Sequence, residues 1–100
     1  MKLLFNLGRI LVTDQAHVAL IRARQSDYDF LIRHQSGDWG DALPDLHAKN
    51  EAALARPAAG RLISIYTSEF GDRLVADTLF GGPGEPIATT LSLLSENNLS

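Results

Sequence analysis

One group of side chains in this sequence could perform acid–base chemistry on a phosphodiester. His34 could act as a general base, because its ordinary pKa of about 6.5 lies close to physiological pH. Arg61 could hold a phosphate group, and Ser64 and Tyr66 could position it through their hydroxyl groups. A small metal-independent ribonuclease uses these residue types, here with His34, Arg61 and Tyr66 as its centre. The same residues are equally expected at a helix end and along a strand, so we carry the ribonuclease as an alternative hypothesis.

Other kinds of catalytic or binding chemistry have little support in the sequence. The chain has no cysteine, which excludes disulfides, thiol catalysis and zinc sites built on thiolates. His17 and His47 have no second ligand at a suitable spacing, so no metal and no cofactor is expected. The glycine-rich segment 81–86 reads as a loop and lacks the Lys-Ser/Thr pair of a phosphate-binding P-loop.

Length and composition predict one small globular domain that spans residues 1–100. The 100 residues are 45% hydrophobic and 21% charged, which argues against disorder. A net charge of −3 does not favour nucleic acid as a partner, although it does not forbid it. No apolar run approaches the roughly 20 residues that a membrane span needs, so we expect a cytoplasmic protein without membrane contact. Residues 1–8 and 95–100 are expected to form a flexible leader and tail.

Turn and capping residues divide the chain into seven elements. Strands are expected at 9–13, 61–67, 73–80 and 87–94, and helices at 15–25, from the Ser26 cap to near Gly37, and from Pro44 to about Pro57. The order β-α-α-α-β-β-β indicates an α+β fold. Three short helices would pack on one face of a three- to four-stranded, mainly antiparallel sheet. The place of the first strand in that sheet is left open.

Apolar spacing predicts which side chains of the helices are buried. Val18 and Ile21 are expected to widen the apolar stripe of the first helix. Tyr28 and Leu31 can share the buried face of the second helix. Asn50 falls on an otherwise apolar stripe of the third helix. A buried amide must find partners, so we expect Asn50 to tie this helix to a turn or to the sheet.

The strongest local signal is the pair of glycines that brackets the only tryptophan. Gly37 and Gly40 allow a sharp turn on either side of Trp39, which could then anchor a helix–helix corner in the core. Asp38 and Asp41 can bond to nearby backbone amides in that corner. In the competing interpretation, Trp39 is partly exposed beside the two carboxylates and contacts a partner.

A domain this small leaves little room for a deep pocket, so a binding surface should be a face or an edge. The outer side of the predicted hairpin could present Ser64, Tyr66 and Arg73, with Asp38 and Asp41 at the rim. Tyrosine and arginine are among the residues that most often anchor interfaces. These five residues form the predicted partner-binding surface.

Several segments of the chain resemble a family of small uncharacterised accessory proteins carried by plasmids, integrative elements and phages. They are residues 31–34 (LIRH), 37–41 (GDWGD), 50–54 (NEAAL) and 60–66 (GRLISIY), with weaker likeness at 7–10 and 89–91. Some members bear the label "type I restriction endonuclease subunit M", although a chain of this length has no room for a methyltransferase. This sequence departs from the family at 74–86, where relatives carry an acidic-basic run with a tryptophan. It departs again at 95–98, where relatives end on Pro-acid-Tyr.

The resemblance implies the setting of a mobile genetic element. Small proteins of such elements often act in counter-defence, as anti-restriction or anti-CRISPR proteins. The main hypothesis is therefore a non-enzymatic accessory protein that binds a macromolecular partner, with a protein favoured over a nucleic acid. The alternatives are the ribonuclease centred on His34 and a purely structural subunit of a larger complex. The sequence leaves the oligomeric state open.

Overall fold

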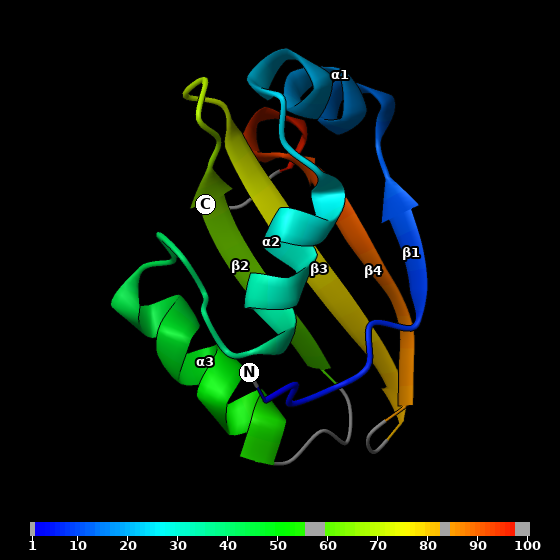
Figure 1. The fold of residues 1–100 in the computed structure, drawn as a ribbon. Coiled ribbons are helices and arrows are strands. Elements are labelled where there is room, and N and C mark those ends of the chain that lie inside the picture. The colour runs from blue at the N-terminus through cyan, green and yellow to red at the C-terminus, as the bar shows by residue number, and fades with distance from the viewer. Residues whose placement is uncertain (1, 56–59, 83–84, 98–100) are drawn as a thin grey trace.

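The computed structural model describes residues 2–55, 60–82 and 85–97 and has the predicted element order, so the α+β class is confirmed (Figure 1). The elements are β1 (Arg9–Val12), α1 (Asp14–Ala23), α2 (Asp27–Gln35), α3 (Pro44–Ala55), β2 (Gly60–Thr67), β3 (Arg73–Gly82), β4 (Glu85–Leu93) and a 3₁₀ turn, η1 (Leu94–Glu96). The predicted end of the third helix near Pro57 and the last residues of the tail lie outside the described residues.

The described strands form one mixed sheet in the order β1-β4-β3-β2. β2 and β3 form the predicted antiparallel hairpin, and β4 returns antiparallel beside β3. The first strand lies at the far edge and runs parallel to β4, with Arg9 opposite Ala88 and Val12 opposite Leu91. A parallel neighbour requires a long connection between the two strands. Here the helices, β2 and β3 lie between β1 and β4 in the chain.

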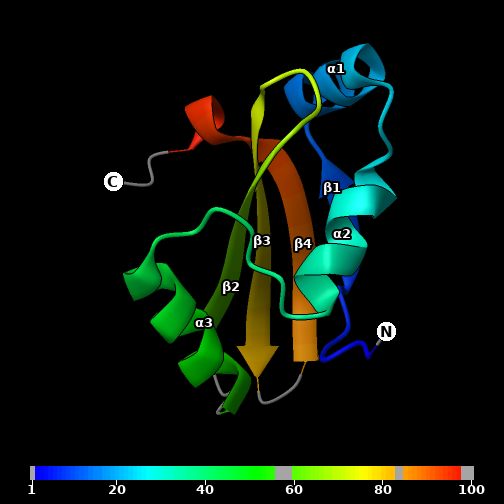
Figure 2. The same ribbon diagram turned by 60° about the vertical axis from the view of Figure 1, so that its left-hand side comes forward.

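All three helices pack on the same face of the sheet (Figures 1 and 2). Side chains alternate along β2, so Leu62, Ser64 and Tyr66 share one face, and all three are buried. Partly buried side chains of α3 pack against Leu62 and Phe80 on that face, and α3 lies beside β2. Leu20 of α1 packs in a separate cluster that includes Tyr66. The opposite face of the sheet carries Arg61, among others.

Short polar side chains begin the first two helices as predicted. The Thr13 hydroxyl accepts from the Ala16 N–H at the start of α1. Ser26 and Asp29 form a complete capping box at the start of α2. α1 ends at Ala23, two residues before the predicted end, because Arg24 adopts a left-handed backbone with φ of 56°.

The hydrophobic core consists of two clusters on the helix-covered face. The first contains Ala16, Leu20, Phe30, Tyr66, Leu74, Ala76 and Leu91, and the second contains Trp39, Ala42, Leu62 and Phe80. Residues 2–8 contain no helix or strand, but they pack onto this core. The Leu4 N–H donates to the Gln35 carbonyl at 2.7 Å, and Leu7 is buried.

Three local predictions are wrong. Val18 and Ile21 do not widen the buried stripe of α1 but face outward, because α1 turns its small alanines toward the sheet. Tyr28 is likewise exposed at the start of α2. The segment 81–86 is mostly strand, since β3 continues to Gly82 and β4 begins at Glu85.

Candidate functional site

The proposed general base lies at the centre of a buried chain of hydroxyl groups. His34 has no exposed surface. Its Nδ1 lies 2.5 Å from the Ser64 hydroxyl, and its Nε2 lies 2.9 Å from the Thr78 hydroxyl. Thr78 Oγ1 lies 2.6 Å from Thr89 Oγ1, which donates to the Leu7 carbonyl at 2.7 Å. We call His34, Ser64, Thr78 and Thr89 the hydroxyl chain. It joins α2 to β2, β3, β4 and the leader.

The carbonyl at the end of the hydroxyl chain fixes the direction of the hydrogen bonds from Thr89 back to His34 Nε2. A carbonyl can only accept, so the single hydroxyl proton of Thr89 is used on Leu7. Thr78 must then donate to Thr89, and its oxygen accepts from His34 Nε2–H. Burial lowers the pKa of His34 to about 4, so at neutral pH Nδ1 carries no proton and the Ser64 hydroxyl donates to it. His34 is a neutral imidazole protonated on Nε2, with both ring nitrogens satisfied.

Aromatic rings enclose this imidazole on two sides. The rings of Phe5 and Trp39 pack edge-on against His34, with centroid distances of 5.2 and 5.8 Å. Burial disfavours the charged imidazolium and lowers the pKa of His34 from 6.5 to about 4. At neutral pH this histidine stabilises the core and has no access to a substrate.

The structure does not bring the three residues of the ribonuclease hypothesis together. Tyr66 is buried with its hydroxyl donating to the Asp38 carbonyl, and burial raises its pKa. Arg61 lies on the opposite face of the sheet. Side chains alternate along a β-strand, and Arg61 is an odd number of residues away from both Ser64 and Tyr66. Its guanidinium lies 3.3 Å from Asp77 there. A sheet therefore separates the proposed cation from the proposed base.

The predicted partner-binding surface is only partly exposed. Asp38, Asp41 and Arg73 lie at the surface, but Ser64 and Tyr66 are in the core, so the prediction that the latter two face outward is wrong. Their side of β2 is the one that the helices cover. Within that cover, the hydroxyl of Ser64 is satisfied by His34 and that of Tyr66 by a backbone carbonyl.

The exposed acids of this surface are already paired. Asp38 accepts from Arg33 Nε at 2.8 Å, and this hydrogen bond lowers the pKa of Asp38 and raises the pKa of Arg33. The guanidinium of Arg33 also lies 4.5 Å from the centre of the Tyr66 ring. Asp41 accepts from the Thr67 hydroxyl at 2.8 Å.

The glycine-bracketed tryptophan segment protects one edge of the sheet. Trp39 is 1% exposed and belongs to the second core cluster. The Ile65 N–H donates to the Trp39 carbonyl at 3.1 Å, and the Asp41 N–H donates to the Ile65 carbonyl at 2.6 Å. Gly40 lies between them with φ of +67°, and an added Cβ would come 2.1 Å from the Ile65 carbonyl oxygen. Only glycine allows this close approach to β2.

Asn50 satisfies the next pair of backbone groups along the same edge. Its side-chain amide donates to the Ile63 carbonyl at 2.7 Å, and its side-chain oxygen accepts from the Ile63 N–H at 3.0 Å. The amide therefore pairs with β2 as a neighbouring strand would. Asn50 ties α3 to the sheet and is fully buried. Both sets of contacts close the β2 edge to any further strand.

The other edge of the sheet has no such protection. The Thr13 N–H donates to the Leu91 carbonyl at 3.0 Å, so the backbone groups of Leu11 and Thr13 point toward β4. Because backbone groups alternate along a strand, those of Ile10 and Val12 point away from the sheet. Within residues 2–55, 60–82 and 85–97, no hydrogen bond joins Ile10 or Val12 to a segment on that side. Figure 1 shows β1 with no element on its outer side.

Apolar side chains accompany this open backbone edge. Ile10 is 48% exposed and Leu11 is 41% exposed, and they lie on opposite faces of the strand. The sequence does not reveal this edge, because the apolar run from Ile10 to Val12 reads as part of the interior. The parallel pairing of β1 with β4 is what places this strand at the edge of the sheet.

Two further findings concern metal-binding groups and membrane-spanning helices in the described residues. Among these residues, no group of three or more His, Cys, Asp or Glu could hold a metal ion. None of the described helices is long and apolar enough to cross a membrane. No protein-family model, curated protein or solved structure matches the chain.

Proposed function

We propose that this chain is a non-enzymatic accessory protein of a mobile genetic element that acts by binding a protein partner. The sequence resemblance to accessory proteins of plasmids, integrative elements and phages supports this setting. It also supports a counter-defence role, in which the partner is a component of a restriction or CRISPR system. The burial of His34 and Tyr66 favours binding over catalysis, because neither side chain is accessible to a substrate.

The single observation that carries the proposal is the contrast between the two sheet edges. On β2, the backbone groups of Ile63 and Ile65 are paired by Asn50 and by the Trp39–Asp41 segment. On β1, the outward backbone groups have no partner in the described residues. Natural proteins usually protect both edges, because an open edge recruits other strands. An open edge can accept an extended segment of another protein as a further strand.

The geometry of β1 suggests that an extended segment of the partner adds to the sheet as a further strand. Backbone hydrogen bonds at Ile10 and Val12 would supply affinity, and the side chains on the two faces of the edge would supply specificity. Ile10 and Leu11 are apolar, so the partner strand should place apolar side chains beside them. The net charge of −3 does not favour a nucleic acid as the occupant.

The decisive variant removes one outward N–H without disturbing the sheet. Ile10→Pro lacks the amide proton that would bond to the partner, and proline is tolerated where the N–H of an edge strand faces solvent. The matched control is Ile10→Ala, which removes the same side chain and keeps the amide. Each tagged variant is used to capture proteins from lysate of a host cell, and thermal unfolding is recorded in parallel.

We expect the wild-type chain and Ile10→Ala to retain the same captured protein, and Ile10→Pro to lose it at an unchanged melting temperature. Loss of the partner from both variants would indicate a side-chain contact in place of strand addition. Capture by Ile10→Pro at the wild-type level would contradict the proposal. Cleavage of RNA by the purified chain, abolished by His34→Ala, would restore the ribonuclease hypothesis.

A further inference from the structure

The outward face of α1 carries apolar side chains where a surface helix is normally polar. Ala16, Ala19 and Leu20 face the core, as an amphipathic helix requires. Val18 and Ile21 lie on the opposite side of the helix and are 60% and 63% exposed. Neither residue contributes to the core, so folding alone does not explain their type.

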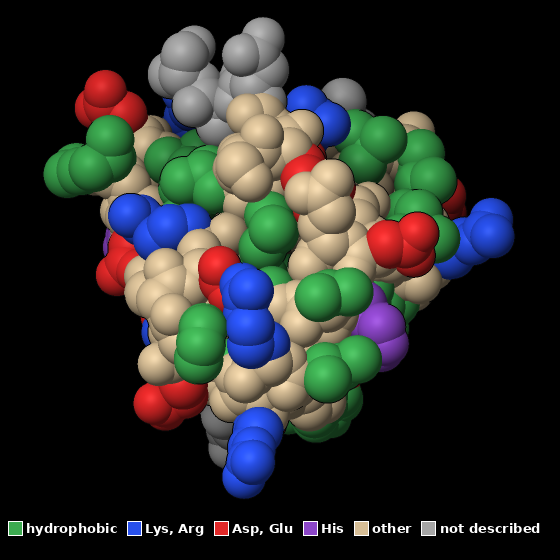
Figure 3. Space-filling view, turned by 90° about the horizontal axis from the view of Figure 1, so that it is seen from above, with side chains coloured by type: hydrophobic (Ala, Val, Ile, Leu, Met, Phe, Trp, Pro, Cys, Tyr) green, Lys and Arg blue, Asp and Glu red, His purple; other side chains and the backbone are tan. Residues whose placement is uncertain are grey.

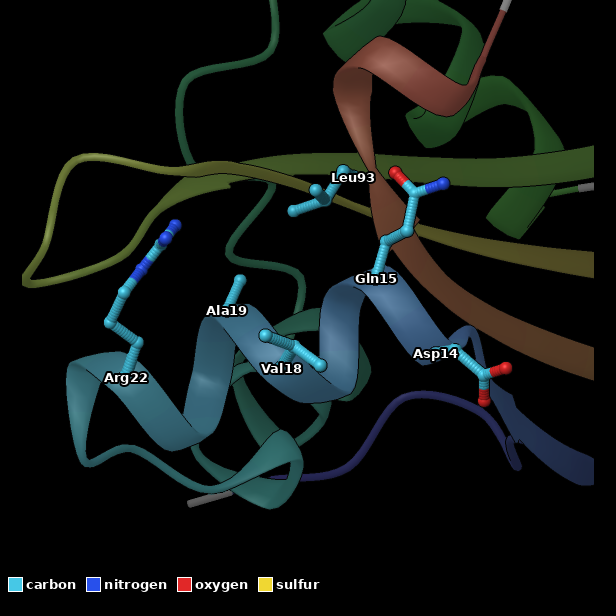
Figure 4. Close-up of a pocket in the computed structure, with 6 residues that line it drawn as sticks. All are labelled: Asp14, Gln15, Val18, Ala19, Arg22 and Leu93. Atoms are coloured by element: carbon cyan, nitrogen blue, oxygen red, sulfur yellow. The ribbon is translucent and has the colours of Figure 1, made fainter.

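A shallow hollow runs along this helix, between α1 and the end of β4. Figure 3 views this end of the molecule and shows several hydrophobic side chains at its surface. The volume of the hollow is about 350 Å³, and it is lined by Asp14, Gln15, Val18, Ala19, Arg22 and Leu93. Figure 4 shows Gln15 and Ala19 projecting from α1 toward the side on which Leu93 lies, and Arg22 projecting toward the turn between β2 and β3. The hollow could take one apolar side chain from another molecule.

A projecting aromatic ring lies beside the hollow, on the turn between β2 and β3. Phe70 is 63% exposed, and the Arg22 guanidinium lies 5.1 Å from the centre of its ring. Arg22 also donates to both carboxylate oxygens of Asp72, at 3.1 and 2.9 Å. These contacts attach the turn to α1. One surface therefore carries both an apolar hollow and an apolar ring, and we call it the α1 face (Val18, Ile21, Arg22, Phe70 and Leu93).

The charges of α1 are arranged symmetrically about this face. Asp14 lies four residues before Val18 and Arg22 lies four residues after it. Positions four residues apart lie on the same side of a helix. If a second copy of α1 packs antiparallel with the two Val18 residues in contact, each Asp14 faces Arg22 of the partner copy. Arg22 bonds to Asp72 of its own chain through Nη2 alone and its side chain is 52% exposed, so other N–H groups of the guanidinium are left for the partner's carboxylate. The same arrangement occurs twice, as a two-fold axis requires.

We propose that the α1 face binds a second copy of this chain and forms an antiparallel two-fold dimer. The charge pairs select the antiparallel direction, and the apolar residues supply the buried contact. A stable interface typically buries about 800 Å² of each partner. A ten-residue helix alone is too small for that, so the turn with Phe70 and the hollow beside Leu93 belong to the same interface. A contact of this size predicts a reversible dimer whose population rises with concentration.

The oligomeric state in solution tests this proposal, by sedimentation velocity of the full chain over a range of concentrations. The wild type should shift from monomer to dimer as concentration rises. Val18→Asp should weaken the dimer on the order of tenfold or more, because it places a charge at the centre of the contact. The matched control is Leu43→Asp, which adds the same charge at an exposed leucine outside the α1 face and should leave the dimer unchanged.

A charge exchange tests the antiparallel pairing itself. Asp14→Arg alone places two basic groups together twice in the dimer, and Arg22→Glu alone places two acidic groups together twice. Each variant should therefore be monomeric where the wild type is dimeric. An equimolar mixture should dimerise again, because in the heterodimer the two introduced side chains have opposite charges and face each other. The native Asp14 of one copy then faces the native Arg22 of the other. Arg22→Glu also breaks the ion pair with Asp72 in its own chain. The mixture separates the two effects, because it restores the charge pairs between copies but not this ion pair. Melting temperatures of both variants are measured as controls for folding.

Three results would overturn the proposal. They are a wild-type chain that is monomeric at every concentration, a dimer that Val18→Asp does not weaken, and a mixture of the charge variants that stays monomeric. A monomeric chain whose Val18→Asp variant loses a captured host protein would assign the α1 face to that protein. The Ile10→Pro variant should still dimerise, so failure of the dimer and failure of strand addition at β1 can be distinguished.

Discussion

Protonation of His34 should destabilise the folded protein at mildly acidic pH. The neutral imidazole accepts from Ser64 at Nδ1 and donates to Thr78 at Nε2. A second proton on Nδ1 would turn the Ser64 hydroxyl from a donor into an acceptor, in a site closed by Phe5 and Trp39. The protonated imidazole would keep both hydrogen bonds, but it would be a buried charge with no counter-ion among the described residues.

The size of this effect follows from the pKa of His34, which burial lowers from 6.5 to about 4. Between these two values the unfolded chain binds a proton that the folded chain does not, so stability falls as pH falls. The stabilising contribution is complete above pH 6.5 and is lost through the interval down to about pH 4. At 1.36 kcal/mol per pH unit, the full loss is about 3 kcal/mol. That is a large part of the roughly 5–15 kcal/mol typical of small domains.

Urea unfolding at a series of pH values between 7 and 4 measures this loss. Other groups also titrate, among them Asp38, whose pKa is lowered, and Asp77, whose pKa is raised by burial. The comparison is therefore with His34→Gln, whose side chain can reach the same hydroxyl groups but does not titrate. The unfolding free energy of the wild type minus that of His34→Gln should fall by about 3 kcal/mol from pH 7 to pH 4. Parallel curves for the two proteins would refute the reasoning.

Substitutions at three residues test the closed β2 edge and its tryptophan. Trp39→Ala should cost about 3–5 kcal/mol of unfolding free energy, since it empties the second core cluster; a melting temperature near that of wild type would show that the ring is dispensable. Asn50→Ala should cost about 2–4 kcal/mol in urea unfolding, because both backbone groups of Ile63 lose their partner. An Asn50→Asp variant of wild-type stability would contradict that assignment, since aspartate cannot donate to the Ile63 carbonyl. Gly40→Ala should lower the melting temperature strongly, because its Cβ would collide with the Ile65 carbonyl; a neutral effect would mean that this segment does not hold the edge.

Capping residues and strand alternation predicted the element order, because these signals are local. Ser26 and Asp29 form the capping box that their spacing indicates, and Thr13 caps α1. The alternation of β2 likewise separates Ser64 and Tyr66 from their neighbours. Such patterns depend only on backbone geometry and short-range hydrogen bonds, so a single sequence contains them.

The choice between the two faces of a strand is not local, and this is where the prediction of the binding surface fails. Alternation places Ser64 and Tyr66 on one face but does not say whether helices cover it. The polar character of these residues suggested solvent, but their hydroxyls are satisfied by His34 and by the Asp38 carbonyl in the core. Those partners lie 30 and 28 residues away in the chain. No pattern within β2 identifies them.

The two candidate surfaces depend on the same kind of long-range information. Ile10 reads as an interior strand residue until its position at the edge is known. Val18 reads as part of a buried stripe until the rotation of α1 is fixed by Ala16 and Ala19 against the sheet. In both cases the residue type predicts burial, and the fold leaves the residue exposed. An exposed residue of a type suited to the core indicates a binding surface, and its exposure is known only once the fold is known.

Hydrogen–deuterium exchange of the purified chain, alone and with its captured partner, tests the central claim most directly. The account predicts that the Ile10 and Val12 amides exchange rapidly in the free chain and become protected in the complex. The Ile63 and Ile65 amides, already paired with Asn50 and Trp39, should be protected in both states. Ile10 and Val12 amides that exchange equally fast in the free chain and in the complex would contradict strand addition at β1.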